Sequence, residues 1–296
     1  MSFRYGGDSA VNVQNLVVPD AAQATPFRWL SDASSLIPTT KLYTIANERR
    51  EEYQAGSPFP HIVIDNLFDD DVLNELLAVF PDPKLRHWHR FDAEQEIKLA
   101  LDAEDVIPIQ IRLFLYFLNG SLFMSFLEHL TGISGLIPDP HWFGGGLHQI
   151  ERGGKLAVHA DFNRQDRLRL DRRLNLLIYL NKDWSPEFGG DFELWNRDMT
   201  ACVKKVAPLF NRMVIFSTTD FSYHGHPDEL QCPPDRSRKS LALYYYSNGR
   251  PDEEISERHS TLFRPRPEES FKGRIRRRLK PFVPPVLFSL YDHVTR

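Results

Sequence analysis

The chain has 296 residues, of which 42% are hydrophobic, 12% aromatic and 26% charged, so it can bury a sizeable core as one large domain or two small ones. This composition is too apolar for a disordered chain, and the formal net charge of −4 excludes the global basic field that nucleic-acid-binding proteins use. Two cysteines, Cys202 and Cys232, cannot build a disulfide scaffold, which favours the reducing environment of the cytoplasm.

The N-terminal region, residues 1–55, has the pattern of an irregular arm with one or two short helices and no recognisable chemistry. Its opening residues contain no apolar stretch after their one arginine, so we expect no secretory signal. Residues 61–66 are then predicted to form a strand, and a helix follows that is capped within residues 69–71. The apolar stripe of this helix consists of Val72, Leu73, Leu76, Leu77 and Phe80.

A polar segment, residues 86–105, leads into the apolar residues 107–131. The most apolar run, residues 113–127, is interrupted by Asn119-Gly120-Ser121 and is shorter than the roughly 20 residues that a membrane span needs. We therefore predict two buried helices that meet at a turn, and no transmembrane segment. Residues 56–140 together are interpreted as an N-terminal helical layer.

Beyond this layer the pattern changes to short β-forming runs separated by Gly, Pro, Asn and Asp. We predict strands at residues 147–151, 156–159, 174–180, 191–195, 201–206, 212–217 and 239–246. Seven or eight such strands, preceded by helices, are typical of a double-stranded β-helix, or jelly roll. The prediction is an α+β, mainly β fold in which residues 56–250 form one domain, with its jelly-roll core at residues 141–250.

The remaining residues, 251–296, form a C-terminal extension that is first polar and then strongly basic. Six basic residues lie between Lys272 and Lys280. Such a run is typical of a solvated segment or of one that docks onto an acidic partner.

The motif His159-Ala160-Asp161 ends one of the predicted strands. Residues two apart on a strand point to the same face, so this imidazole and this carboxylate converge on one point. One further histidine completes the two-histidine, one-carboxylate set of iron(II) oxygenases, which leaves three coordination positions open. The motif taken alone is better explained by a surface loop with a stray histidine, but His224 and His226 follow about 65 residues later. Either one could supply the third ligand.

A basic run, Arg236-Ser237-Arg238-Lys239-Ser240, enters the strongly β-forming segment LALYYYS. Strand parity puts Arg238 and Ser240 on one face and Lys239 on the other. An arginine at the start of a strand can form a bidentate pair with a carboxylate, so Arg238 could hold the far carboxylate of an oxo diacid while Ser240 adds a hydroxyl donor. Arg236 is the alternative.

The segments HAD, YLNKDW, GGDFELW, NRMVIFSTTDFSYHGHP and RSRKSLALYYY resemble the prolyl-hydroxylase branch of the 2-oxoglutarate- and Fe(II)-dependent oxygenases, over residues 142–248. The resemblance implies three iron ligands: His159, Asp161 and His224. It also implies three residues that bind the C5 carboxylate of 2-oxoglutarate: Arg238, Ser240 and Tyr179. The interval between Phe216 and His224 matches the family, whereas HPDELQCPPD lengthens the interval before Arg238 relative to the oxygen-sensing prolyl hydroxylases.

The resemblance further implies a dioxygenase that uses O2 and 2-oxoglutarate, hydroxylates an unactivated C–H bond and releases succinate and CO2, with ascorbate in support. Its second substrate is a prolyl or other amino-acid residue in a protein or peptide, or a small molecule, and the sequence does not choose between these. The arginine-rich loop after Asp161 favours an anionic group, with Arg164, Arg167 and Gln149 as tentative contacts. A non-catalytic jelly roll that binds metal or acts as a sensor is the alternative; it predicts a missing ligand or clamp.

Overall fold

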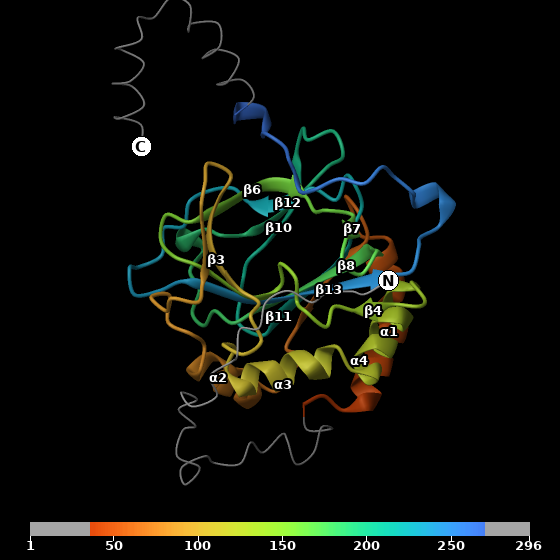
Figure 1. The fold of residues 1–296 in the computed structure, drawn as a ribbon, viewed down its shortest axis with the longest axis horizontal. Helices are drawn as coiled ribbons and strands as arrows, with labels where there is room; N and C mark the ends of the chain where they lie inside the picture. The colour runs from red at the N-terminus through yellow and green to blue at the C-terminus, as the bar shows by residue number, and fades with distance from the viewer. Residues whose placement is uncertain (1–35, 270–296) are drawn as a thin grey trace, which may run out of the picture.

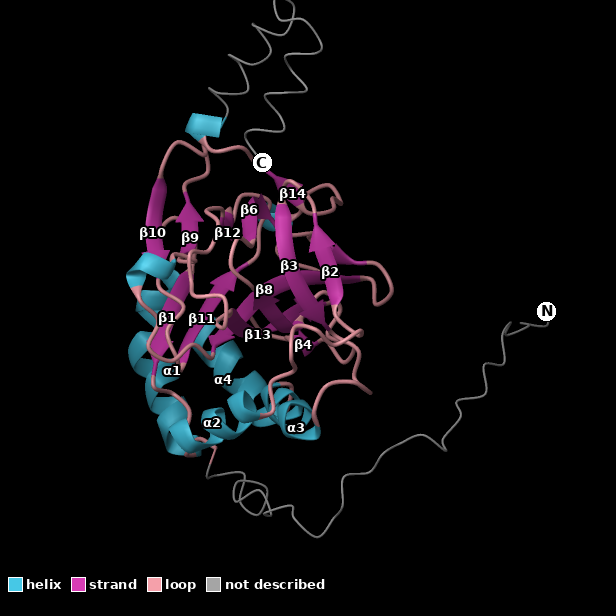
Figure 2. Ribbon diagram, turned by 90° about the vertical axis from the view of Figure 1, so that its left-hand side faces the viewer, coloured by secondary structure: helices cyan, strands magenta, loops and turns pink. Residues whose placement is uncertain are grey.

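Four helices form a layer along one side of a curled β-sheet in the computed structural model, which describes residues 36–269 (Figures 1 and 2). The helices are α1 (Thr39–Gln54), α2 (Asp70–Ala78), α3 (Ile109–Leu118) and α4 (Ser121–Thr131). Two short 3-10 helices, Pro186–Phe188 and Asp252–Glu254, lie in later loops.

The strands form one antiparallel sheet in the order β1-β11-β8-β13-β5-β3-β6-β12-β9-β10, and β2, β4, β7 and β14 pair at its margins. Their bounds are β1 (His61–Asp65), β2 (His89–Asp92), β3 (Glu96–Leu101), β4 (Ile137–Pro138), β5 (Gly146–Ile150), β6 (Lys155–Ala160), β7 (Arg164–Gln165), β8 (Leu170–Tyr179), β9 (Phe192–Trp195), β10 (Cys202–Val206), β11 (Arg212–Ser217), β12 (His224–His226), β13 (Arg238–Ser247) and β14 (Leu262–Phe263). This mainly β, curled sheet confirms the predicted fold class.

The long strands β8 and β13 separate the helical layer from the interior of the curled sheet. On β8, Leu174, Leu176 and Ile178 belong to the large apolar core that the helices complete, whereas Asn175 and Leu177 line a cavity on the opposite face. β13 alternates in the same way, with Leu241, Leu243 and Tyr245 in the core. Strand alternation thus keeps one face of the sheet for packing and leaves the other for polar side chains.

The helical layer forms from local signals that the sequence already shows. Asp69 caps α2 by accepting a hydrogen bond from the backbone amide of Asp71. α3 and α4 break at Asn119 and Gly120, and most of their apolar side chains are buried in the core. Within the described chain no single helix is long and apolar enough to cross a membrane, although α3 and α4, bent by 47°, pass that test as a pair.

Two regions among residues 36–105 are more regular than the sequence indicated. Within the predicted arm, α1 is a helix of 16 residues that packs against α4 and β1. The polar segment 86–105 contains the β2–β3 hairpin, and β3 bridges β5 and β6. The sequence of β3 shows no clear alternation of apolar and polar residues, because charged side chains such as Glu96 and Lys98 lie half-buried on the strand. The first 35 residues, to which the expectation of no secretory signal applies, and the basic run 272–280 lie outside the described residues.

Candidate metal centre

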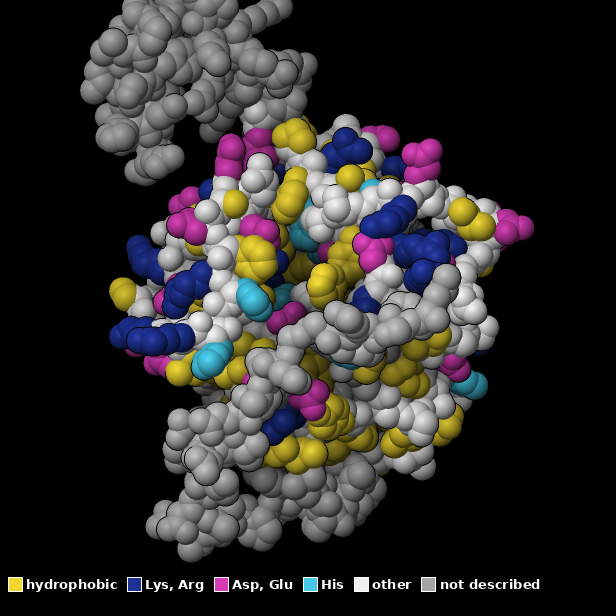
Figure 3. Space-filling view, viewed as in Figure 1, with side chains coloured by type: hydrophobic (Ala, Val, Ile, Leu, Met, Phe, Trp, Pro, Cys, Tyr) yellow, Lys and Arg dark blue, Asp and Glu magenta, His cyan; other side chains and the backbone are white. Residues whose placement is uncertain are grey.

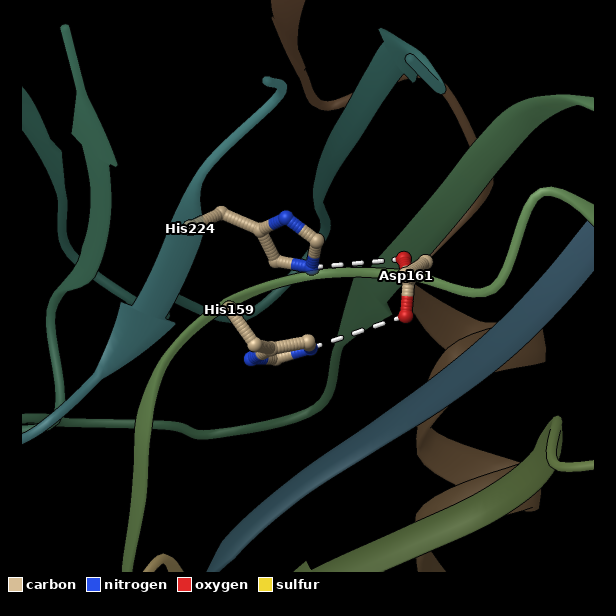
Figure 4. A group of neighbouring side chains, drawn as sticks. All are labelled: His159, Asp161 and His224. Carbon is tan, nitrogen blue, oxygen red and sulfur yellow. Dashed lines mark ion pairs between the residues drawn. The ribbon is translucent and has the colours of Figure 1, made fainter. Parts of the chain in front are cut away.

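Two strands and the residue that follows one of them bring the three predicted metal ligands together (Figure 4). His159 on β6 is paired in register with His224 on β12, and Asp161 follows the end of β6. The Nε2 atoms of His159 and His224 each lie 3.5 Å from an oxygen of the Asp161 carboxylate. One ligand atom from each residue lies within 4.8 Å of the other two, so the three can share one ion.

Hydrogen bonds to the backbone orient both imidazoles. Nδ1 of His159 lies 2.9 Å from the carbonyl oxygen of Ala157, and Nδ1 of His224 lies 2.8 Å from that of Ser222. A ring that donates from Nδ1 to a carbonyl keeps its lone pair on Nε2, the atom that faces Asp161. Burial lowers the pKa of His224 to about 3, so this ring is neutral, the form that binds a metal. The donor set therefore fits iron(II).

Arg172 and Asn175 hold the carboxylate of Asp161. The guanidinium Nη2 of Arg172 lies 3.2 Å from Oδ2 of Asp161, and Asn175 donates a 2.6 Å hydrogen bond to the same oxygen. Arg172 also donates to Asn175, and the rings of Phe162 and Tyr244 lie on its guanidinium. Burial alone would raise the pKa of Asp161, but Arg172 and the two histidines hold it well below its usual range. The carboxylate is therefore ionised and oriented without a metal.

The sequence did not identify Arg172 in this position. The sequence predicts that residues 162–173, Arg172 among them, form the arginine-rich loop beside the site, but β8 begins at Leu170 and Arg172 is almost fully buried. Alternation from Leu174 would turn Arg172 toward the helical core. A register shift opposite Tyr245 and Tyr246 reverses the alternation and places Arg172 on the side of Asp161.

The other end of the same cavity contains Arg238 and Ser240 from β13. Arg238 is only 4% exposed, and its Nε donates to the carbonyl oxygen of Gly190 at 2.9 Å. Its Nη2 donates to the hydroxyl of Tyr179 at 3.2 Å, and Tyr179 is the register partner of Ser240. The structure thus brings these three sequence-predicted residues together. Arg238 forms no ion pair with any carboxylate of residues 36–269.

The backbone conformation and close neighbours of Gly190 explain why a glycine is needed at this contact with Arg238. Its φ of +78° lies in the left-handed region that favours glycine, and an added Cβ would lie 3.1 Å from Cδ of Arg238 and 2.5 Å from a methyl group of Leu230. The glycine therefore allows its backbone oxygen to approach the guanidinium.

The structure separates the two pairs of alternatives that the sequence left open. Arg236 donates to the backbone oxygens of Lys182 and Asp183 and does not line the cavity, whereas Arg238 does. His226 lines the cavity but lies outside the group of mutually close ligand atoms, to which His224 belongs.

The tentative substrate contacts do not join the metal ligands. Gln149 lies on the opposite face of β5 from His148 and donates to Ser237, because neighbouring strand residues point to opposite sides. Arg164 lines a separate cavity together with Arg250 and Arg258, and Arg167 is exposed and lines neither cavity. The predicted loop is in fact a turn between β7 and β8.

The C-terminal extension contributes to the metal centre, which the sequence did not predict. β14 pairs with the metal strand β6, and the ring of Phe263 lies 5.5 Å from that of His159. Asn163 donates to Ser256 and to the backbone of Glu257. This segment therefore covers the edge of β6 beside the ligands.

The cavity opens on the face that Figure 3 shows, where the surface is hollowed and histidine and hydrophobic side chains are visible inside. Its charged lining is mostly basic, with Lys98 and Arg238, and Asp161 is its acidic member. Apolar residues, among them Leu177 and Phe216, form much of the remaining wall.

Comparisons with known proteins agree with this geometry. Residues 145–246 match the family model of the 2OG-Fe(II) oxygenase superfamily, a range that contains all three ligands and Arg238. No curated protein sequence matches the chain. The match confirms the resemblance to this superfamily, which implies Fe(II) and 2-oxoglutarate and supports a dioxygenase.

Several solved structures are similar to this chain at low sequence identity. A prolyl hydroxylase from Trichoplax adhaerens, in complex with a hypoxia inducible factor oxygen degradation domain peptide fragment, has a TM-score of 0.52 and 16% identity, covering 75% of this chain and 94% of its own. A prolyl-4-hydroxylase from Pseudomonas putida has a TM-score of 0.47 and 15% identity, covering 70% of this chain and 100% of its own. HygX from Streptomyces hygroscopicus, with nickel, 2-oxoglutarate and hygromycin B bound, has a TM-score of 0.44 and 10% identity, covering 75% of this chain and 96% of its own.

Proposed function

We propose that this chain, with the 2OG-Fe(II) oxygenase match over residues 145–246, is an Fe(II)- and 2-oxoglutarate-dependent dioxygenase that hydroxylates an unactivated C–H bond. The overall reaction converts substrate–H, 2-oxoglutarate and O2 into substrate–OH, succinate and CO2. His159, Asp161 and His224 would hold the iron, and Arg238, Ser240 and Tyr179 would bind the distal carboxylate of 2-oxoglutarate.

One observation carries the proposal: a single cavity joins a metal-ligand triad to a buried arginine that forms no ion pair with a carboxylate of residues 36–269. A buried charge is costly unless it is paired, so Arg238 favours a ligand that brings a carboxylate. A 2-oxo diacid has a chelating group at one end and a carboxylate at the other, which matches the two ends of the cavity.

In this proposal the residues of the chain bind and orient the iron and the 2-oxoglutarate, and they exclude water from the cavity. When bound, iron(II) supplies the redox chemistry by which O2 and 2-oxoglutarate yield succinate, CO2 and an oxidised substrate. Asp161 is already ionised and held by Arg172 and Asn175, so the ligand set needs little rearrangement. Leu177 and Phe216 give the cavity apolar walls, which protect the oxidation from water.

For the second substrate we propose an amino-acid-like group, such as a prolyl residue in a peptide, or an anionic small molecule, in the cytoplasm. Lys98 lines the cavity besides the proposed 2-oxoglutarate contacts; it is ion-paired with Glu96 but is a further cationic group there, and this supports an anionic or hydrogen-bond-accepting group. A non-catalytic metal-binding or sensor module would lack a ligand or the clamp, and all of them are present in this cavity.

The test measures succinate release from 2-oxoglutarate by the purified chain with Fe(II), O2 and ascorbate. No second substrate is added, because conversion of 2-oxoglutarate without substrate oxidation can be measured before that substrate is known. We expect slow release that stops without iron. An Asp161→Ala variant is the matched control for contaminating activity. Iron and 2-oxoglutarate binding with no succinate above this control would favour the non-catalytic module.

A further inference from the structure

His226 is a buried side chain of the cavity to which the proposed chemistry gives no role. It lies on β12 two residues after His224, is 4% exposed and lines the cavity of the metal triad. Neither of its ring nitrogens has a hydrogen-bond partner among residues 36–269. Buried polar atoms in folded proteins nearly always have a partner, so one without a partner suggests a bound group.

The other histidines of this cavity are each tied to the backbone. His159 and His224 contact carbonyl oxygens through Nδ1, and His148 contacts that of Gly144 through Nε2 at 3.1 Å. His226 differs from all three because its ring is positioned by packing alone. Its two nitrogens are therefore both free to meet a ligand.

His226 lies at the Arg238 end of the cavity. In the β12–β6 pairing His224 is opposite His159, whereas His226 is opposite Leu156, three residues farther from Asp161. Leu156 and Ile150 line the cavity as well, and Ile150 is the register partner of Arg238. Gly190 accepts a hydrogen bond from Arg238 and shares a surface depression with His226. The two side chains thus flank the same glycine.

We propose that His226 is a second anchor for the distal carboxylate of the 2-oxo diacid, beside Arg238, and so determines selectivity for a dicarboxylic co-substrate. This inference rests on the proposed function. An imidazole offers at least one N–H donor in either protonation state, and a carboxylate accepts up to about four hydrogen bonds. Arg238 already donates from Nε to Gly190 and from Nη2 to Tyr179, so Arg238, Tyr179 and Ser240 need not fill all of the about four acceptor positions of the carboxylate. A 2-oxo acid without the distal carboxylate would leave both His226 and Arg238 unpaired.

The experiment compares two ligands on three proteins: wild type, His226→Leu and His226→Gln. Leucine removes the donor at similar volume, and glutamine keeps one. The proteins are loaded with Mn(II) in place of iron, and binding of 2-oxoglutarate and of 2-oxopentanoate, the same chain without the distal carboxylate, is measured by calorimetric titration and competition. Mn(II) affinity and the thermal midpoint are recorded for each protein.

We expect His226→Leu to weaken 2-oxoglutarate binding by about tenfold, the size of one hydrogen bond to a charged group, and to leave 2-oxopentanoate binding unchanged. His226→Gln should restore part of the loss. Mn(II) affinity should stay unchanged, because His226 is not a ligand, and removal of an unpartnered polar ring should not lower the thermal midpoint.

Other outcomes overturn the inference in distinguishable ways. Equal losses for both ligands, or a loss of Mn(II), would give His226 a role in the fold or in metal binding. An unchanged 2-oxoglutarate affinity in His226→Leu, with wild type binding normally, would mean that only water meets the ring. Wild-type protein that binds Mn(II) but no 2-oxoglutarate would refute the proposed function and this inference with it.

Discussion

The two ends of the cavity differ in how their buried charges are balanced. At the metal end the carboxylate of Asp161 is met by Arg172, Asn175 and two imidazoles, all from the chain itself. At the other end Arg238 has only neutral partners, a backbone carbonyl and a tyrosine hydroxyl. The metal end is therefore preorganised, whereas Arg238 gains a directly paired carboxylate only when an anion binds.

This difference has a physical reason. A metal ion binds the deprotonated form of its ligands, and here the chain already supplies the positive charge that keeps Asp161 ionised. A co-substrate must bind and leave in every cycle, so its charged partner in the chain stays unpaired between turnovers. Substitutions at the metal end should therefore change stability and iron affinity, whereas substitutions at the other end should change 2-oxoglutarate affinity.

The largest effect is expected from the ligands themselves. His159→Ala, Asp161→Ala and His224→Ala should each reduce succinate release by about a hundredfold or more, because each removes one of three groups that share one ion. The fold should persist in the two histidine variants, as measured by circular dichroism. His87→Ala, at an exposed histidine, is the control. Retained iron binding in His224→Ala, with loss in His226→Ala, would show that the third ligand is assigned wrongly.

Arg172→Met should destabilise the metal-free protein by about 3–5 kcal/mol, because Asp161 stays buried without its cationic partner. Iron affinity should also fall by about ten- to a hundredfold through loss of carboxylate orientation. Chemical denaturation and metal titration measure the two effects. Arg86→Met, at an exposed arginine, is the control. If Arg172→Met is as stable as wild type and binds iron normally, Arg172 does not preorganise the metal end, and the proposed difference between the two ends is wrong.

Arg238→Ala should leave folding and iron binding intact and raise the 2-oxoglutarate requirement more than about tenfold, because loss of a charge-assisted pair with a buried carboxylate costs about 2–5 kcal/mol. The measurement is the 2-oxoglutarate dependence of succinate release. Arg238→Lys should rescue only part, since an ammonium cannot reproduce the planar fork. Arg236→Ala is the matched control, and an equal effect there would contradict the assignment of Arg238.

The smallest effect should come from Gly190→Ala, which would displace Arg238 without removing it. The strain and the contact with Arg238 should weaken 2-oxoglutarate binding several-fold and lower stability by about 1–3 kcal/mol. Gly189→Ala is a close control, because Gly189 also has a positive φ, +69°, but an added Cβ there meets nothing within 4 Å. If both variants lose affinity equally, backbone strain and not the Arg238 contact is the cause.

Local sequence patterns were sufficient to predict several parts of this protein. Short β-forming runs between Gly, Pro, Asn and Asp predicted the seven principal strands, with β11 placed at its observed bounds and the others shifted at their ends. The two-residue spacing of His159 and Asp161 predicted their convergence, and the same parity placed Arg238 and Ser240 together. Family resemblance supplied His224 and Tyr179, which alternation could not select.

The completion of each end of the cavity depends on contacts between distant parts of the chain. A register shift in β8 turns Arg172 toward Asp161, and β14 reaches the metal strand from about 100 residues away. The same pairing geometry removes Gln149 from the cavity and leaves His226 in it without a partner. These results depend on which strands meet and in which register. That choice is made by the packing of residues distant in the chain, and local periodicity does not encode it.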